Sequence, residues 1–140
     1  MDIFKFRFDH VRPLTLNHCY GTGYKGRKYR KPEYLGLQSE VDHQILDRHS
    51  KLVEELNLRC DEHTVLKVEY NFHYSILTKK KCVSKKSLDL DNIVKPINDI
   101  IFSHLKIDDS KTCELLVKKI ESKKEFIECT ITVYDSYPLV

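Results

Sequence analysis

The sequence has no long hydrophobic run. None of its segments approaches the ~20 consecutive apolar residues that a membrane-spanning helix needs. The segment Met1–Phe8 alternates charged and aromatic side chains and lacks the continuous apolar stretch of a secretory signal peptide. We therefore expect a cytoplasmic protein with no membrane partner.

Cysteine and histidine do not form the clusters that a metal site or a disulfide framework needs. The five cysteines lie far apart, at positions 19, 60, 82, 113 and 129, with no Cys-x-x-Cys pair. His43 and His49 are six residues apart, which suits neither a helical ligand pair nor a zinc finger. Because the number of cysteines is also odd, we expect reduced thiols without disulfides or a zinc site.

Glycine-rich phosphate loops, internal repeats and low-complexity segments are missing as well. Hydrophobic residues account for 41% of the sequence and charged residues for 32%, a balance typical of soluble globular proteins. A chain of 140 residues fits a single domain spanning 1–140.

Positive charge is concentrated in two segments. Residues 21–31 and 78–88 hold ten of the 24 Lys and Arg residues and none of the 21 Asp and Glu residues, so the rest of the chain is net negative. Two basic loops on an acidic body favour a specific surface for a polyanion such as nucleic acid. The candidate DNA-binding residues are Lys25, Arg27, Lys28, Arg30, Lys31, Lys79, Lys80, Lys81, Lys85 and Lys86.

Hydrophobic periodicity predicts an α+β domain with a mixed or antiparallel sheet of about four strands and two main helices. A long irregular stretch at 9–33 separates the first strand from the first helix. Asn92 is a candidate N-cap for the second helix, with Pro96 in its first turn. The expected strands are around 4–8, 66–74, 112–120 and 125–134, and the expected helices are 37–56 and 93–105.

Two acidic pairs flank the second expected helix. Asp89 and Asp91 precede it, directly after the second basic segment, and Asp108 and Asp109 follow it. In extended chain, residues i and i+2 point the same way, so Asp89 and Asp91 can present two carboxylates to one point. A hard cation such as Mg²⁺ relieves the repulsion between such carboxylates. The same aspartates can instead cap a helix and mark a turn.

Lys95 lies one helical turn after Asp91. It can steady the charge that develops on a phosphate in the transition state, or form a surface ion pair with Asp99. The sequence alone leaves both interpretations open.

The run Asp89-Leu90-Asp91-Asn92, followed by Lys95, Asp99 and Asp108-Asp109, resembles the signature of the RusA family of Holliday junction resolvases, or crossover junction endodeoxyribonucleases. Residues 115–133 resemble the closing hairpin of that family, and residues 12–17 resemble its N-terminal loop with proline and asparagine. The resemblance covers nearly the whole chain in the order of its elements, with the specific motif at about 89–109.

This resemblance implies a fold and a chemistry. Asp89, Asp91 and Asp109 match the metal-binding aspartates, Lys95 matches the catalytic lysine, and Asp99 and Asp108 match supporting acids. It also implies a homodimer that uses Mg²⁺, with Mn²⁺ as a substitute, and nicks opposed strands of four-way junctions in recombination and repair. Such enzymes occur in phages, prophages and bacteria, so we expect a nucleoid-associated protein in a bacterial cell or an infected host.

Four tyrosines, at positions 20, 24, 29 and 34, interleave with the first basic segment. Aromatic rings among cations can stack on unpaired bases at a branch point, with Tyr24 and Tyr29 as the candidates, or they can pin the loop to the body. Two rival functions also stay open: a non-catalytic nucleic-acid-binding module with structural aspartates, and another Asp-x-Asp enzyme such as a nucleotidyl or glycosyl transferase.

The length of the second helix poses a geometric problem for a metal site. About 13 residues span about 20 Å at 1.5 Å per residue, whereas carboxylates that share one Mg²⁺ must lie within several ångströms of each other. Either the helix is short or bent, or Asp109 comes from the partner subunit of a two-fold dimer.

Overall fold

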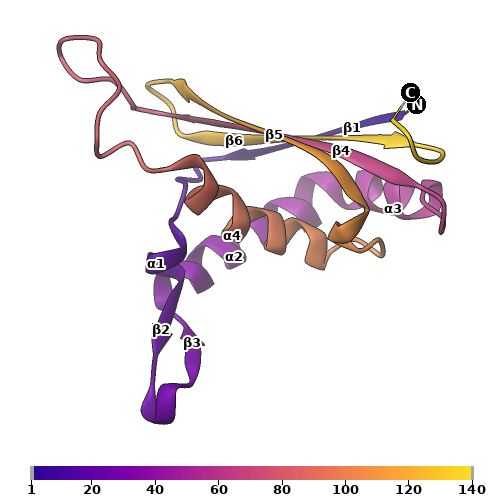
Figure 1. Ribbon diagram of the computed structural model, residues 1–140, viewed down its shortest axis with the longest axis horizontal. Coiled ribbons are helices and arrows are strands. Elements are labelled where there is room, and N and C mark those ends of the chain that lie inside the picture. The colour runs from indigo at the N-terminus through magenta and orange to yellow at the C-terminus, as the bar shows by residue number, and fades with distance from the viewer. Residues whose placement is uncertain (1, 140) are drawn as a thin grey trace.

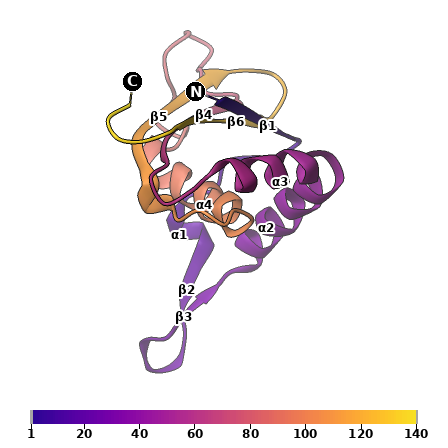
Figure 2. The same cartoon turned by 90° about the vertical axis from the view of Figure 1, so that its right-hand side faces the viewer.

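The computed structural model describes residues 2–139 as a four-stranded sheet that carries helices on one face and leaves the other face open (Figures 1 and 2). The strand order is β1-β6-β4-β5. β6 pairs antiparallel with both β1 and β4, whereas β5 pairs parallel with β4. The strands are β1 (Asp2–Asp9), β4 (Val65–Tyr74), β5 (Thr112–Glu121) and β6 (Phe126–Tyr134). The predicted α+β class with a mixed sheet is confirmed.

Alternation along the strands explains the sheet's two faces. Phe4, Phe6 and Phe8 of β1 are buried, while the residues between them are exposed. β4 follows the same period, with Tyr70 and Phe72 fully buried at its centre. Because successive strand residues point to opposite faces, the apolar set lies under the helices and the polar set lies on the open face.

The first long helical segment extends further than predicted. It consists of α2 (Pro32–Gln44), a π-helical turn η2 (Ile45–His49) and α3 (Ser50–Arg59). Proline is tolerated at the first turn of a helix, where its missing N–H breaks no bond, so the helix begins five residues before the expected 37. Among the described residues, no helix combines the length and apolar character that crossing a bilayer requires.

The π turn places polar side chains against the outer edge of β1. The Gln44 amide donates to the Asp9 carbonyl at 2.7 Å and accepts from the Asp9 N–H at 2.8 Å. The His49 ring lies within hydrogen-bonding distance of both the carbonyl and the N–H of Arg7. An i→i+5 turn brings residues 44 and 49 into line along the helix. These side chains satisfy backbone groups that an edge strand leaves unpaired.

The second long helix, α4 (Leu90–Ser103), also begins earlier than predicted. Asp89, and not Asn92, occupies its N-cap position, and Pro96 is its seventh residue instead of a first-turn residue. The prediction started the helix at the first residue of its apolar stripe. The buried face of the helix, with Ile93, Ile97 and Ile100, packs under the sheet. The helix also includes residues 90–92, which precede this face.

The stretch at 9–33 is not irregular. It contains a short helix α1 (Leu16–Cys19) and a two-stranded arm made of β2 (Tyr20–Thr22) and β3 (Lys28–Arg30), with a 3₁₀ turn η1 (Tyr24–Gly26) at the tip. The arm projects away from the body below α1 (Figures 1 and 2). Strands of three residues are too short to show a period-2 pattern, so periodicity alone misses them.

The predicted closing hairpin is wrong. β5 and β6 are consecutive in sequence but lie on opposite sides of β4. Their connection crosses the end of β4, where the Ser122 N–H donates to the Tyr74 carbonyl at 3.0 Å. β6 buries alternate residues against the same helices as β4, and its pairing with both β1 and β4 leaves β5 at the outer edge of the sheet, beside β4.

Candidate active site and nucleic-acid interface

The N-terminal end of α4 presents Asp89 with an uncommitted carboxylate. Its backbone is extended, and its carbonyl accepts from the N–H groups of Asn92 at 3.1 Å and Ile93 at 3.2 Å. Its side chain is exposed and makes no capping hydrogen bond. An N-cap carboxylate usually accepts from an N–H of the first turn. Here the backbone caps the helix, which leaves the side-chain oxygens free for a ligand.

Asp91 stands in the first turn of α4 and is exposed. The positive end of the helix dipole favours a carboxylate there. The extended Asp-x-Asp geometry that we predicted is wrong for Asp91, because the helix already begins at Leu90. Both carboxylates nevertheless belong to the same helix end.

Lys95 and Asp99 form the surface ion pair that sequence left as one alternative. The Lys95 Nζ lies 3.4 Å from an Asp99 oxygen, and the lysine side chain is 61% exposed. Exposed pairs of this kind contribute little to stability. The pair therefore does not prevent Lys95 from turning toward a phosphate bound at the helix end.

The other acidic pair lies at the far end of α4. Asp108 caps the 3₁₀ turn η3 (Asp109–Lys111) by accepting the Ser110 N–H at 2.8 Å, and this bond holds the pKa of its carboxyl below the usual value. Asp109 is exposed and lines a shallow cavity of about 400 Å³ together with Phe102 and Ile107. One of these two carboxylates serves the local turn, and the other is available.

One chain does not gather the three candidate metal ligands. Within residues 2–139, no group of three or more His, Cys, Asp or Glu side chains is arranged to hold a metal ion. After Asp91, α4 continues through residues 92–103 before the chain reaches the second pair, a length of about 18 Å at 1.5 Å per residue. Asp89 and Asp91 suit a hard cation by the chemistry of their oxygens, but a third carboxylate from Asp109 of the same chain does not reach them.

A lysine that the sequence analysis missed fixes the chain just before Asp89. Lys119 of β5 is half-buried, and its ammonium donates to the Ser87 hydroxyl at 2.8 Å and to the Leu88 carbonyl at 3.0 Å. The Tyr74 hydroxyl donates to the Ser87 carbonyl. Leu88 has a positive φ of 73°, which non-glycine residues rarely adopt. Lys119 lies on the helix-side face of β5, as Val117 does. A lysine in register with an apolar residue on that face is the sequence signal that could have indicated this contact.

The comparison with known families agrees with this arrangement. The sequence profile described as Endodeoxyribonuclease RusA matches residues 21–132 of the chain. The chain belongs to the RusA family. No curated protein matches it.

RusA proteins are Holliday junction resolvases, endodeoxyribonucleases that act on phosphodiester bonds, and they depend in general on a divalent metal. The matched residues include the arm, the second basic segment and both ends of α4. Residues 12–17, which resembled the family's N-terminal loop, lie outside the match. Membership in a nuclease family weighs against both the non-catalytic module and the transferase.

The second basic segment of this RusA protein forms an extended loop between β4 and α4. A single bridge between Leu77 and Val83 closes it, and the loop returns to the body at Ser87. Figure 1 shows the loop reaching outward beyond the end of the sheet at which α4 begins. All five of its lysines are exposed, so they remain available for phosphate contacts: Lys79, Lys80, Lys81, Lys85 and Lys86.

The arm divides its basic residues into two groups. The Lys31 ammonium donates to the Asn17 carbonyl at 3.2 Å, and the Arg30 guanidinium bonds the Gln38 side chain at 3.3 Å, so these two join the arm to the body. Lys25, Arg27 and Lys28 are exposed toward the tip. The tip, more than the base, is free to contact DNA.

The tyrosines divide in the same way. Tyr34 is buried and packs with its ring centroid 5.4 Å from that of half-buried Tyr20, so this pair pins the arm. Tyr24 is 85% exposed at the tip. Tyr29 is half exposed, and its ring lies so close over Gly21 that a Cβ there would come within 2.4 Å of it. The Lys25 ammonium lies 5.5 Å from the Tyr24 centroid, so Tyr24 combines an exposed ring with a neighbouring cation and is the better candidate to stack on a base.

Proposed function

We propose that this RusA protein is a homodimer that cuts four-way DNA junctions by paired nicks, with a divalent cation held by Asp89, Asp91 and Asp109. Mg²⁺ is the proposed ion, with Mn²⁺ as a substitute. The observation that carries the proposal is the free Asp89 carboxylate at the N-cap, beside exposed Asp91 and directly after the lysine-rich loop.

Each residue has a distinct part in this proposal. Asp89 and Asp91 hold the cation at the helix end. Exposed Lys95 breaks its ion pair with Asp99 and turns to stabilise negative charge on the scissile phosphate. Lys119 positions Asp89 through Ser87 and Leu88. A bound Mg²⁺ would supply Lewis-acid polarisation of the phosphate and ease deprotonation of an attacking water.

The distance between the ends of α4 supports a site shared between subunits. Because α4 runs on to Ser103 after Asp91, the helix end that precedes Asp109 lies about 18 Å from Asp91. A two-fold dimer with antiparallel α4 helices would bring each Asp109 to the other subunit's Asp89 and Asp91. The site in this proposal is incomplete without the partner.

The outer edge of β5 supports a place for that dimer. β5 is the last strand of the sheet, with Leu115 49% and Leu116 39% exposed. A long edge strand with exposed apolar residues is a template for pairing with another chain. Two β5 strands paired antiparallel about a two-fold axis would also set the two α4 helices antiparallel, as shared sites require.

Cleavage assays test the nuclease proposal directly. The protein is incubated with a labelled four-way junction or a linear duplex of the same sequence, with Mg²⁺, Mn²⁺ or EDTA. We expect symmetric nicks in the junction with either metal, little cutting of the duplex, and none in EDTA. Metal-independent nicking, or equal cutting of both substrates, would refute the proposed function.

Mixed dimers test the shared site. Subunits carrying Asp91→Asn are combined with subunits carrying Asp109→Asn, and heterodimers are verified by differential tags. If sites are shared, one site collects both substitutions and the other is intact, so single nicks appear. If each chain builds its own site, both sites are damaged, and a verified heterodimer without nicking activity rules out sharing.

A further inference from the structure

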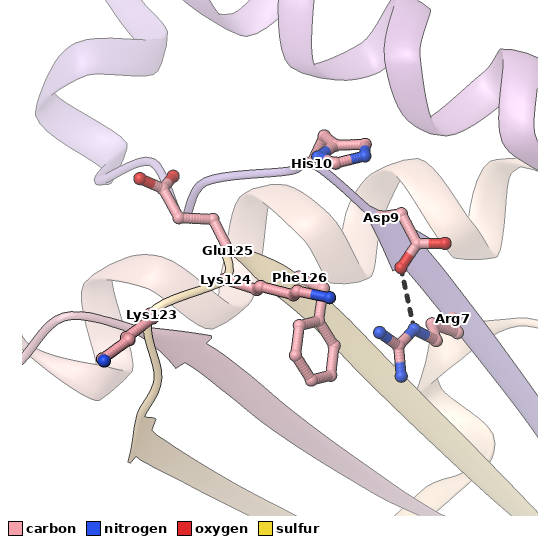
Figure 3. A pocket seen from close by; sticks show the side chains of 7 residues that line it. All are labelled: Arg7, Asp9, His10, Lys123, Lys124, Glu125 and Phe126. Carbon is pink, nitrogen blue, oxygen red and sulfur yellow. Dashed lines mark hydrogen bonds and ion pairs between the residues drawn. The ribbon is translucent and has the colours of Figure 1, made fainter.

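A charged cavity of about 630 Å³ lies where β1 ends and β6 begins, away from the aspartates of α4 (Figure 3). Arg7 and Asp9 line it from β1, and Phe126 lines it from β6. Arg7 alternates with buried Phe6 and Phe8, so the cavity belongs to the open face of the sheet, opposite the helices.

The aromatic ring of this cavity is not available to a base. The His73 ring of β4 stacks on Phe126 at 4.0 Å between centroids, and the Arg7 guanidinium lies 3.9 Å from the Phe126 centroid. β6 lies between β1 and β4, so these two groups cover the ring from opposite sides. The Phe126 ring therefore orients the guanidinium instead of binding a nucleobase.

The charges that face the cavity are predominantly positive. Asp9 accepts from Arg7 at 2.8 Å and from Arg48 at 2.6 Å, and these two bonds lower the pKa of its carboxyl. Two guanidinium groups on one carboxylate leave a net positive charge. Figure 3 shows the Lys124 ammonium pointing into the cavity near Phe126 and Arg7, with the His10 ring at the rim.

The other charged residues of the turn point elsewhere. Lys123 and Glu125 also line the cavity, but in Figure 3 their charged ends point away from Arg7. The Glu125 carboxylate lies 3.9 Å from the Arg12 guanidinium, which offsets its negative charge. The cavity thus offers two cations, Arg7 and Lys124, together with His10, and its aromatic ring is covered. These groups suit the binding of a phosphate.

The cavity wall is held in place by the helices behind it. Buried Gln44 bonds both backbone groups of Asp9, and His49 contacts both backbone groups of Arg7. These contacts fix the strand end that carries the guanidinium. Binding groups that are ordered before the ligand arrives lose less entropy on binding.

The cavity lies at the end of the sheet that carries the lysine-rich loop. The turn between β5 and β6 contacts the base of the lysine-rich loop, where the Glu121 carboxylate accepts from the N–H groups of Ile76 at 3.2 Å and Leu77 at 3.0 Å. We infer that this cavity binds a backbone phosphate of a DNA arm that passes around this end of the sheet onto its open face. The inference rests on the proposed junction binding and extends that interface.

Two neighbouring lysines provide a matched test. Lys124→Gln and Lys123→Gln remove the same charge from the same exposed turn. Both lysines line the cavity, but only the Lys124 ammonium points toward Arg7 in Figure 3. Junction binding is measured in EDTA over a range of salt concentrations. We expect Lys124→Gln to reduce the slope of log K against log[salt] by about 0.9, the loss of one phosphate contact, while Lys123→Gln keeps the wild-type slope. Equal slopes for the two variants would overturn the inference and leave junction binding intact.

Shortened junction arms identify the source of the phosphate. Wild-type affinity should fall when the arms become too short to reach the cavity, and the affinity of Lys124→Gln should not fall further. Competition by inorganic phosphate at constant ionic strength that depends on Lys124 would instead assign the cavity to a free anion and overturn the DNA contact. Failure of the wild type to bind any branched DNA would refute the inference together with the proposed function.

Discussion

The two ends of α4 carry the same kind of acidic pair in different surroundings. At the N-terminal end, the Asp89 side chain makes no capping bond, Asp91 is exposed, and the lysine-rich loop and the arm lie nearby. At the C-terminal end, Asp108 accepts a backbone N–H, and the nearby Lys111 ammonium donates to the Glu62 carbonyl. Only Asp109 remains available there.

This difference shows that a carboxylate's role depends on what else claims its oxygens. Asp89 holds a cap position without using its side chain, whereas Asp108 uses its side chain to cap a turn. A carboxylate whose oxygens are not used by local structure is free to bind a cation. Asp108 therefore has a structural role, and the difference supports the ligand roles that we propose for Asp89, Asp91 and Asp109.

The largest effect should follow from removing a carboxylate at the N-terminal end. Asp91→Asn keeps the shape but removes a ligand charge, so junction cleavage should fall by more than about 100-fold, since losing even an outer-sphere partner costs 10–100-fold. Junction binding should persist, because less negative charge then faces phosphate. Asp47→Asn, on the exposed side of η2, is the matched control and should cut normally. Full cleavage activity of Asp91→Asn would contradict the proposed metal-binding role of the N-terminal end of α4.

The next largest effect should distinguish the lysines of the loop before α4 from lysines elsewhere on the surface, in the salt dependence of junction binding. Replacing Lys79, Lys80 and Lys81 by Gln should lower the salt slope of junction binding by about 0.9 per lost phosphate contact. Lys51 and Lys106 are exposed on α3 and just beyond α4, and the same substitution there should change the slope far less per charge removed. Equal changes per charge would show that net charge, and not one face, drives binding.

The sequence predicted most of the strands of the sheet and the nuclease family, whereas the site residues stay a prediction. Alternation along β1, β4 and β6 was readable because each strand buries one face against helices. The two lysine- and arginine-rich segments and the Asp-x-Asp pair were readable from charge and spacing alone. These features depend on local patterns.

Other features depend on contacts between distant residues. The position of β6 between β1 and β4, which leaves β5 at the sheet edge, depends on pairing between strands that are far apart in the sequence. The π turn serves the backbone of β1, 35 residues away from Gln44 in sequence. Lys119 anchors Ser87 across 32 residues. No window of neighbouring residues contains these partners, so local periodicity could not reveal them.

A smaller effect is expected from the arm tip, which extends the N-terminal region of the interface. Tyr24→Leu should weaken binding to a four-way junction by about 1 kcal/mol or more, close to 5-fold, because stacking on an unpaired base contributes about 1–3 kcal/mol. Binding to linear duplex, which offers no unpaired base, should change less. Tyr137, 73% exposed beyond β6, provides the control substitution and should leave both affinities unchanged. Equal losses on junction and duplex would argue against stacking.

The smallest effect should separate the two neighbouring aspartates at the C-terminal end. Asp108→Ala removes the acceptor of the Ser110 N–H and should lower the thermal midpoint by about 2–5 °C, whereas Asp109→Ala should leave it nearly unchanged. The cleavage ranking should be the reverse, because Asp109 is the proposed ligand. Asp108→Asn, which keeps an acceptor, should retain both stability and cleavage.

The pKa of Asp108 is lowered from 3.8 by its bond to Ser110, so the contribution of this carboxylate to stability is present above that pH and is lost as pH falls through the folded-state pKa. Urea midpoints of wild type and Asp108→Ala should therefore stay separated at neutral pH and converge only below about pH 4. Convergence already at pH 6, or loss of cleavage in Asp108→Asn, would mean that Asp108 has a role beyond its turn and that both acids at this end serve the active site.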